Sequence, residues 1–429
     1  RSGNRGIRPG GRLVMGSGDG QRWPPRGAID RSRLPTPGTT RPFIFPAVEK
    51  STLGNGLRTR TIRHTAIPVV SLMVLVRRGS AADPPGREGL AALTLDMLDE
   101  GCGDRSAIAF HEDIARVGAH LDLDIGADYV LVTVTALSRM LDRAVDILAD
   151  VVARPALRDA DVDRVLQLRL HRLRQLRDIP GALAERAFTR VLYGADPYGH
   201  TPLGWEATLG ALTARDVREF HAQAIRPGDA TLIAVGACTH DEIRRSAERA
   251  FAGWTGDGEH EVSEHEEGRA EEGRLGAAPP AASVLAKEPA SQSASEPARL
   301  YLIPRPGAQQ SELRIGHVGP SRSTPDFHAL VALNAVLGGQ FASRINLNLR
   351  EDKGFTYGAR TSFEFRRRPG PFSLQVSVQT SATKAAIQES LDEIDAIRGR
   401  RPVTPGELAL GVAGLTRGYP RGFETAEQL

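Results

Sequence analysis

The chain has 429 residues, more than one hydrophobic core usually organises, so two domains of roughly 200 residues each are expected. Charged residues make up 25% and hydrophobic residues 40%, a composition that is typical of globular proteins and excludes a chain disordered throughout. No apolar run reaches the roughly 18 residues of a membrane-spanning helix, so we predict a soluble protein without a membrane span.

The formal net charge of +3 hides a strongly basic N-terminal segment. Residues 1–43 contain nine Arg against only Asp19 and Asp30. A basic arm of this kind can bind nucleic acid, but Trp23 is the one aromatic residue interleaved with the charges, and no recognition motif follows. We therefore interpret residues 1–43 as a disordered basic tail and expect no nucleic-acid partner.

Cysteine usage and the N-terminus leave the cellular compartment open. Cys102 and Cys238 give no disulfide framework and no metal knuckle. The chain begins with Arg1 and has no apolar signal core, so a signal peptide can be absent, removed or outside the sequence. Periplasm and cytoplasm both remain open.

Folded character begins near Phe43, and an Asn-Gly pair within residues 53–57 predicts a hairpin turn before a strand at 69–76. Hydrophobic periodicity and capping residues predict the other elements of the first half. These are helices at 88–100, 107–117, 138–152, 159–177, 213–224 and 239–251, a strand pair within 119–137, and a strand at 230–235. The first domain therefore spans residues 44–254.

Residues 255–297 change in composition to Glu, Gly, Ala, Ser and Pro, which predicts a solvated linker. The acidic run 260–267 includes two His, and we interpret it as solvated charge rather than a metal site. Residues 298–429 then repeat the α+β order of the first half, and internal duplication is one interpretation. The predicted elements are strands near Leu300 and Leu313, helices at 325–337 and 344–349, strands at 355–365 and 372–378, and a helix from Thr383.

A motif in the first half resembles a known family. Arg78-Gly79-Ser80 ends a strand, and residues 89–96, GLAALTLD, follow it. This frame resembles the small-residue strand end and the G-L-A-H-x-x-E-H helix of the insulinase/pitrilysin family (inverted zincins). In that family two His at i and i+4 bind Zn²⁺, and the Glu between them is the general base. The resemblance assigns these positions to Ala92, Leu95 and Asp96, of which only Asp96 has a side chain that binds metal ions.

The family's third zinc ligand is a Glu on a later helix that ends in D-x-P. Asp178-Ile179-Pro180 sets the register, and counting back places Arg172 at the Glu position. A guanidinium cannot ligate Zn²⁺ and repels it, so the resemblance implies a degenerate zinc site. Asp96 then has two interpretations: a solvated or capping carboxylate, or a partner of Arg172 in an ion pair that replaces the metal.

The remaining histidines of the first half do not have the spacing of zinc ligands. His111, which precedes Glu112, and His171 are both interpreted as surface or packing residues. The loop at 197–200 and the stretch from Leu212 to Gly236 resemble framework of the same family. His200 is accordingly interpreted as a loop-packing residue.

The most specific match lies in the second half. Residues 338–358, GGQFASRINLNLREDKGFTYG, resemble the family's G-G-x-F-x-S-R-L…L-R-E-x-x-G-x-x-Y block. In the family this Arg and Tyr hold the substrate backbone and the developing oxyanion, and the resemblance assigns those roles to Arg350 and Tyr357. The structural alternative makes Arg350 a cation at a helix C-terminus and Tyr357 a strand residue.

The resemblance covers residues 45–254 and 298–429. It implies an α+β fold with two homologous α/β-sandwich domains, each an antiparallel sheet with helices on one face, joined by a linker in a clamshell-like arrangement. The second domain of the family is longer than residues 298–429, so we expect its C-terminal helices to be missing from this sequence.

These residues favour a non-catalytic subunit of a heterodimeric zinc metallopeptidase. The expected partner is a zinc-bearing homologue, with a self-dimer as the alternative, and an unfolded peptide is the expected substrate. No cofactor is expected on this chain, because zinc would sit only on the partner. The rival function is a structural or peptide-binding homologue, like the core proteins of the respiratory bc1 complex. A self-sufficient zinc peptidase would need a ligand set that we do not find.

Overall fold

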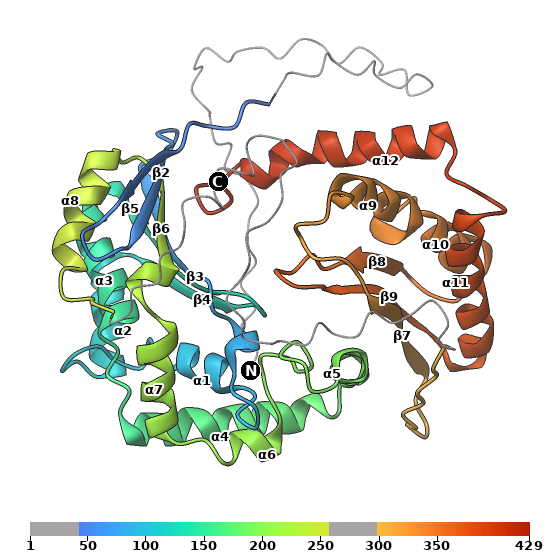
Figure 1. Cartoon of the computed structure of the whole chain (residues 1–429), viewed down its shortest axis with the longest axis horizontal. Helices are drawn as coiled ribbons and strands as arrows, with labels where there is room; N and C mark the ends of the chain where they lie inside the picture. Colours follow the sequence, from blue (N-terminus) through green and yellow to red (C-terminus); the bar gives the residue numbers. More distant parts are fainter. Residues whose placement is uncertain (1–42, 257–297) are drawn as a thin grey trace, which may run out of the picture. The chain divides into compact units, whose positions relative to one another are not determined.

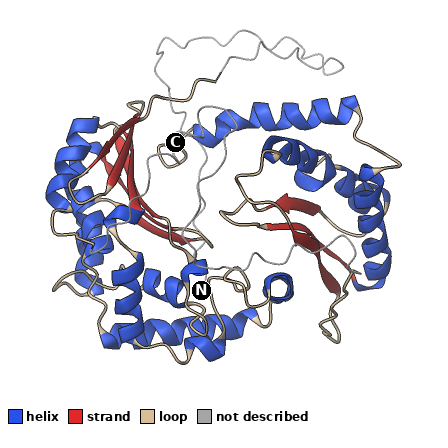
Figure 2. Cartoon of the chain, in the orientation of Figure 1, coloured by secondary structure: helices blue, strands red, loops and turns tan. Residues whose placement is uncertain are grey.

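The computed structural model describes residues 43–256 and 298–429, and this part of the chain contains two β-sheets, each packed against helices (Figures 1 and 2). We call residues 45–256 the first module and residues 298–429 the second module. The predicted α+β class, with two layered domains, is confirmed. The predicted tail (1–43) and linker (255–297) fall almost entirely outside the described residues.

A six-stranded sheet forms the first module, in the order β1-β2-β6-β3-β5-β4. Its strands are β1 (Glu49–Thr52), β2 (Arg58–Arg63), β3 (Val69–Val76), β4 (His120–Ile125), β5 (Val130–Leu137) and β6 (Ala230–Gly236). Only β2 and β6 pair in parallel. The predicted Asn-Gly turn joins β1 to β2, where the Asn55 side chain accepts a 3.1 Å hydrogen bond from the Leu57 amide.

Three helices cover one face of this sheet: α2 (Ala107–Val117), α3 (Leu141–Ala153) and α8 (His240–Ala250) (Figure 1). Two of them begin at a hydroxyl cap, because Ser106 accepts from the Ala109 amide and Thr239 accepts from the Glu242 amide. Short 3₁₀ turns flank the strands at η1 (Ser80–Ala82), η2 (Ser138–Met140) and η3 (Pro227–Asp229). The apolar faces of α2, α3 and α8 form one continuous core with the strands.

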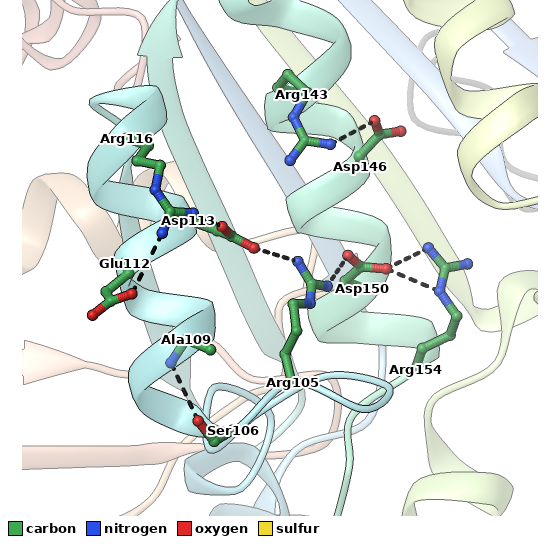
Figure 3. A network of polar contacts seen from close by, with 10 residues as sticks. All are labelled: Arg105, Ser106, Ala109, Glu112, Asp113, Arg116, Arg143, Asp146, Asp150 and Arg154. Atoms are coloured by element: carbon green, nitrogen blue, oxygen red, sulfur yellow. Dashed lines mark hydrogen bonds and ion pairs between the residues drawn. The ribbon is translucent and has the colours of Figure 1, made fainter.

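An arginine network joins the loop before α2 to both α2 and α3 (Figure 3). The Arg105 guanidinium donates to Asp113 on α2 at 3.0 Å and also pairs with Asp150 on α3. Arg154 donates from Nε to the second oxygen of Asp150 at 2.9 Å. The bond from Arg105 lowers the pKa of Asp113, so this carboxylate is held ionised between the two helices.

A second group of helices packs beside the sheet: α1 (Leu90–Asp96), α4 (Asp159–Leu176), α6 (Glu206–Leu209) and α7 (Ala214–Ala224). The next helix in the chain after α4, α5 (Pro180–Tyr193), was not predicted from sequence. Pro180 marks the end of α4 but also occupies the first turn of α5, where its missing amide costs nothing. Within the described ranges, every helix is too short or too polar to cross a bilayer.

The second module has a three-stranded antiparallel sheet in the order β7-β9-β8. Its strands are β7 (Gln310–Val318), β8 (Ala359–Phe363) and β9 (Pro371–Gln379). Its helices are α9 (Phe327–Asn334), α10 (Arg344–Asn346), α11 (Thr383–Arg398) and α12 (Pro405–Gly418), with π-helical segments η4 (Ala335–Gly339) and η5 (Leu347–Asp352) and 3₁₀ turns η6 (Thr380–Ala382) and η7 (Tyr419–Phe423). The helix α12 was not predicted; it begins at Pro405 behind a Thr404 cap.

The element order of the second module repeats part of the first. The series β7, α9, α10, β8, β9, η6, α11, α12 matches β3, α1, α2, β4, β5, η2, α3, α4 in type and order. The strand orders β7-β9-β8 and β3-β5-β4 also match. The predicted strand near Leu300 is wrong, because residues 298–303 form no strand. In the first module the equivalent strand β2 pairs with β6, and no strand of the second module occupies the place of β6.

Each module also contributes apolar contacts to the sheet of the other. The helix α5 packs on β7, where Phe188 lies beside Gly316. Ala426, near the end of the chain, is buried against Ile62 and Val235 of the first sheet. Both contacts cover the sheet face opposite the main helical layer, so neither sheet is completed by its own module alone.

A bidentate ion pair fastens the start of α12 to α10. Arg344 donates from Nε and Nη2 to the two carboxylate oxygens of Glu407, both at 2.7 Å, and from Nη2 to the Pro402 carbonyl at 3.0 Å. The hydrogen bonds from Arg344 lower the pKa of Glu407 from 4.5 to about 2. The pair is therefore charged at all ordinary pH values.

Replacing Glu407 by Gln should lower the unfolding free energy by about 2 kcal/mol at pH 7, because a charge-assisted bidentate contact is lost. Since the folded pKa of Glu407 is depressed, its contribution is fully present above pH 4.5 and disappears as the pH falls through about 2. Urea unfolding between pH 2 and 7 measures this difference. A gap between native and variant chains that does not narrow below pH 4.5 would contradict the assignment.

Candidate functional site

The helix α1 carries the positions that the resemblance assigns to a zinc site, and a buried carboxylate fixes its start. Asp83 accepts hydrogen bonds from the amides of Gly89 at 2.7 Å and Ala91 at 2.6 Å. Gly89 adopts a φ of 103°, a conformation that favours glycine. His200 Nε2 lies 3.0 Å from Asp83 and 3.1 Å from the Ser80 carbonyl, and both side chains of this pair are buried. His200 is thus a packing residue, in agreement with its prediction.

Two of the three assigned positions on α1 face away from solvent. Ala92 and Leu95 are buried, and Leu95 belongs to the core beneath the sheet. Asp96, one turn after Ala92, keeps 43% of its side chain exposed. The three residues therefore offer one carboxylate and two apolar side chains.

The partner of Asp96 is Arg169 on α4, so of the two interpretations of Asp96 the ion pair with Arg172 is wrong. The Arg169 guanidinium contacts the Asp96 carboxylate and donates from Nη1 to the Ala92 carbonyl at 3.3 Å. From Nη2 it donates to the Pro202 carbonyl at 3.2 Å. Arg172 is exposed and forms no ion pair with any residue that the structure describes.

The buried face of α4 explains this correction. Val162, Val165, Arg169 and Leu173 recur at helical spacing and point toward α1 and its neighbours. At about 100° per residue, Arg172 lies about 60° from Arg169 and about 100° from Leu173, and its side chain is exposed at the edge of this stripe. Counting back from Pro180 located the right helix but the wrong turn. The missed signal was the apolar stripe itself, which includes position 169 and excludes position 172.

The residues at this place do not fit a zinc ion. Zinc in proteins takes Cys, His or carboxylate ligands, and Ala92 has no donor atom. The Asp96 carboxylate is already paired with a guanidinium, which carries the positive charge that a metal would bring. Across residues 43–256 and 298–429, no three His, Cys, Asp or Glu side chains gather in a way that could hold a metal ion.

The other histidines of the first module lie outside this arrangement. His111 is exposed and its Nε2 lies 3.7 Å from Asp99. His171 is exposed on α4. Both match their interpretation as surface residues. His260 and His265 lie outside the described part of the chain.

The second predicted pair, Arg350 and Tyr357, lies in the second module. Arg350 belongs to η5, and its guanidinium carbon lies 3.4 Å from the centroid of the Phe341 ring. Glu351 accepts from Arg350 Nε at 2.8 Å and pairs with Nη2 at 2.7 Å. The Arg350 side chain is only 13% exposed, so ring and carboxylate hold it in one orientation.

Tyr357 follows η5 in the loop that leads to β8 and is 96% exposed. Its hydroxyl has no hydrogen-bond partner among the described residues, so the structure does not bring it into contact with Arg350. Phe341 is also highly exposed on the ring face that Arg350 leaves free. The block at 338–358 therefore presents two aromatic rings and one fixed cation. Phe341 is part of this motif, but the sequence alone did not predict its contact with Arg350.

Two family models match the sequence. The insulinase (peptidase family M16) model matches residues 59–201, and the peptidase M16 inactive domain model matches residues 211–415. Together they cover most of both modules. The second match begins before α7 and includes β6, so it extends from the first sheet into the second module.

Curated relatives and solved structures agree with these models. An uncharacterized zinc protease of Streptomyces coelicolor is 24% identical over 88% of this chain and 77% of its own length. One of Mycobacterium tuberculosis is 25% identical, covering 91% and 84%. A crystal structure of a peptidase M16 inactive domain from Pseudomonas fluorescens has a TM-score of 0.72 at 22% identity, covering 87% and 84%. That of a protease from Helicobacter pylori has a TM-score of 0.78 at 18% identity, covering 90% and 87%, so the fold is shared.

Replacing Asp96 by Ala should lower the unfolding free energy by about 3 kcal/mol, because the buried Arg169 guanidinium would lose its carboxylate. Replacing Arg172 by Ala should change it by less than about 0.5 kcal/mol, since Arg172 is an exposed side chain. Urea unfolding of both variants, followed by circular dichroism, measures the difference. If both variants lost the same unfolding free energy, Arg172 rather than Arg169 would be the partner of Asp96.

A zinc site rebuilt on this frame tests the same register by gain of function. The triple variant Ala92→His, Asp96→His, Arg169→Glu should bind one zinc ion per chain, because its three ligands converge between α1 and α4. The matched control carries Arg172→Glu in place of Arg169→Glu and should bind little zinc after gel filtration. Stoichiometric zinc in the control alone would show that position 172 faces α1.

Proposed function

This chain belongs to peptidase family M16, and we propose that it is a non-catalytic subunit whose Arg350 and Tyr357 contact a peptide bound at the zinc site of a partner subunit. The partner is a zinc-bearing homologue, and zinc is expected only on that partner. The substrate class is an unfolded peptide. A structural or peptide-binding role without hydrolysis is the competing function.

The observation that carries this proposal is the fixed guanidinium of Arg350. Phe341 covers one of its faces, and Glu351 occupies the Nε and Nη2 edge. The Nη1 group remains without a hydrogen-bond partner in the described part of the chain. A guanidinium held in this way donates to a carbonyl or oxyanion without reorganising first, which is the property that transition-state stabilisation requires.

The extreme exposure of Tyr357 supports the same role. A tyrosine that contributes to folding usually buries its ring and pairs its hydroxyl. Tyr357 does neither, because it is almost fully exposed. Its phenol is free to donate a second hydrogen bond to a bound peptide. Stability alone therefore does not account for this residue.

The first module supports the assignment of catalysis to another subunit. Ala92, Leu95 and Asp96 supply no ligand set, and Arg169 places a cation where a metal would need a carboxylate. A zinc ion on the partner would supply the activated water. The contribution of this chain is then binding and orientation of the peptide and donation of hydrogen bonds.

Replacing Arg350 by Ala should lower kcat/KM for peptide cleavage by the heterodimer at least tenfold, because one fixed donor is removed. Replacing Tyr357 by Phe should lower it severalfold, since only the hydroxyl is lost. Co-expression with a zinc-bearing homologue, size-exclusion chromatography and a fluorogenic peptide assay give assembly and rate together. The control is Arg398→Ala, which removes an exposed cation on α11.

Unchanged cleavage by the Arg350→Ala heterodimer would overturn the role in catalysis. If that variant still assembles and the native heterodimer also cleaves no peptide, the structural alternative is favoured. Loss of assembly with Arg350→Ala but not with Arg398→Ala would assign Arg350 to the subunit interface instead.

A further inference from the structure

Asn346 is the last residue of α10, and its buried side chain bonds to chain segments on both sides of this helix. The residue is only 5% exposed. Its Nδ2 donates to the Gln340 carbonyl at 3.2 Å and to the Ser343 hydroxyl at 3.1 Å. Its Oδ1 accepts from the Ala359 amide at 2.9 Å, and because a backbone amide only donates, this bond fixes the orientation of the side chain. One side-chain amide therefore joins the segment before α10 to the first residue of β8.

The segment before α10 carries Phe341, and we call residues 340–343 the Phe341 loop. Ser343 occupies the N-cap position of α10, but its hydroxyl accepts no capping bond from the helix backbone. It accepts from the Asn346 side chain instead. In the first module Ser106, at the matching start of α2, accepts from a backbone amide of its own helix. The Phe341 loop is therefore held by a side chain of α10, and this contact has no counterpart at Ser106.

The second segment that Asn346 binds follows the loop with Tyr357. Residues 353–358, which we call the Tyr357 loop, connect η5 to β8 and form a longer connection than the one between the matching α2 and β4. At one end the Phe355 amide donates to a carbonyl of η5 at 2.8 Å. At the other end the amide of Ala359, the next residue after the loop, donates to Asn346. Tyr357 lies between these two bonds, so Asn346 fixes the end of the loop nearer to β8.

We propose that Asn346 is a positioning residue, which holds the Phe341 loop and the Tyr357 loop so that Arg350 and Tyr357 contact the same bound peptide. This inference rests on the function proposed above for Arg350 and Tyr357. Asn346 is buried and acts through the two loops. Two donors serve one reacting group only when both are held in place, and a misplacement of about 1 Å can lower a rate by about a hundredfold. An amide side chain suits this task, because it donates to one loop and accepts from the other.

Asn348, two residues further along the chain, provides a matched control. Its Nδ2 donates to Glu389 and to Glu393, each at 3.0 Å. Both carboxylates belong to α11, so these bonds fix η5 to α11 and lead to neither of the two loops. Replacing either Asn by Leu removes side-chain hydrogen bonds from the same helical region. Only the Asn346→Leu variant removes bonds that end on the loops.

Amide hydrogen exchange of the chain alone, followed by mass spectrometry, tests the placement of the loops. Asn346→Leu should speed exchange in the Tyr357 loop and at Ala359 by about tenfold, because the Ala359 amide loses its acceptor. Asn346→Asp keeps that acceptor but cannot donate to the Gln340 carbonyl, so it should speed exchange in the Phe341 loop only. Asn348→Leu should leave both loops at the native rate.

Native exchange rates in both loops of the Asn346→Leu chain would overturn the proposal. If Asn346→Leu does not fold, Asn346→Asp decides alone. Faster exchange confined to the Phe341 loop is then the expected result, and equal changes in the two loops would contradict it.

Peptide cleavage by the heterodimer tests the role of this placement. Asn346→Leu should lower kcat/KM about tenfold, and Asn348→Leu should lower it less than about twofold. In a Tyr357→Phe background the loss caused by Asn346→Leu should shrink to about threefold, because the hydroxyl that Asn346 positions is already absent. A residue that served stability alone would cause the same loss in both backgrounds, and that result would exclude a positioning role.

The same assay separates this inference from the function on which it rests. Unchanged cleavage with both Arg350→Ala and Tyr357→Phe would overturn the proposed function and the role of Asn346 together. A loss of cleavage with these two variants, but none with Asn346→Leu, would overturn the role of Asn346 alone.

Discussion

The buried guanidinium of Arg169 determines how the first module is arranged around its candidate site. A buried cation is costly unless its donors are paired, and the acceptors of Arg169 come from two other segments of the chain. Ala92 and Asp96 belong to α1, and Pro202 belongs to the loop before α6. These hydrogen bonds fix α1 and the loop relative to α4. A zinc ion would join the same helices by coordination, whereas here hydrogen bonds provide the cross-link without a Lewis acid.

The two groups of residues assigned by the resemblance have different surroundings in this structure. The residues of α1 and α4 serve packing, and Asp83 with His200 secures the start of α1. In the block around Arg350, Tyr357 serves no comparable packing purpose, because it lies almost fully in solvent. Binding by a guanidinium and a phenol does not require a metal in the same chain. The role proposed for Arg350 and Tyr357 therefore does not depend on a metal ion between α1 and α4.

Local sequence signals predicted the elements whose ends depend on local interactions. The strand at 69–76 and the helix at 107–117 have the predicted bounds, because an apolar run fixes the first and Ser106 with Gly118 limits the second. The prediction of a strand near Leu300 was wrong, because a strand forms only when another strand pairs with it. Such pairing joins residues far apart in the sequence, so the local pattern does not reveal it. Arg169 was missed because the motif gave the register of α4 to within one turn only. The exposure of Tyr357 depends on loop geometry that no periodicity encodes.

The topology of the first sheet also has a consequence for synthesis on the ribosome. β3 is a central strand, yet one of its two neighbours, β6, begins at Ala230, about 90 residues after β5 ends at Leu137. At roughly 5–20 residues per second, translation leaves one side of β3 unsatisfied for on the order of 5–20 s. During that interval the nascent chain presents an apolar strand that is open to misassociation. Chaperone contact with residues 69–76 would protect the chain until β6 emerges, and the folding of the first module is thereby tied to the timing of its own translation.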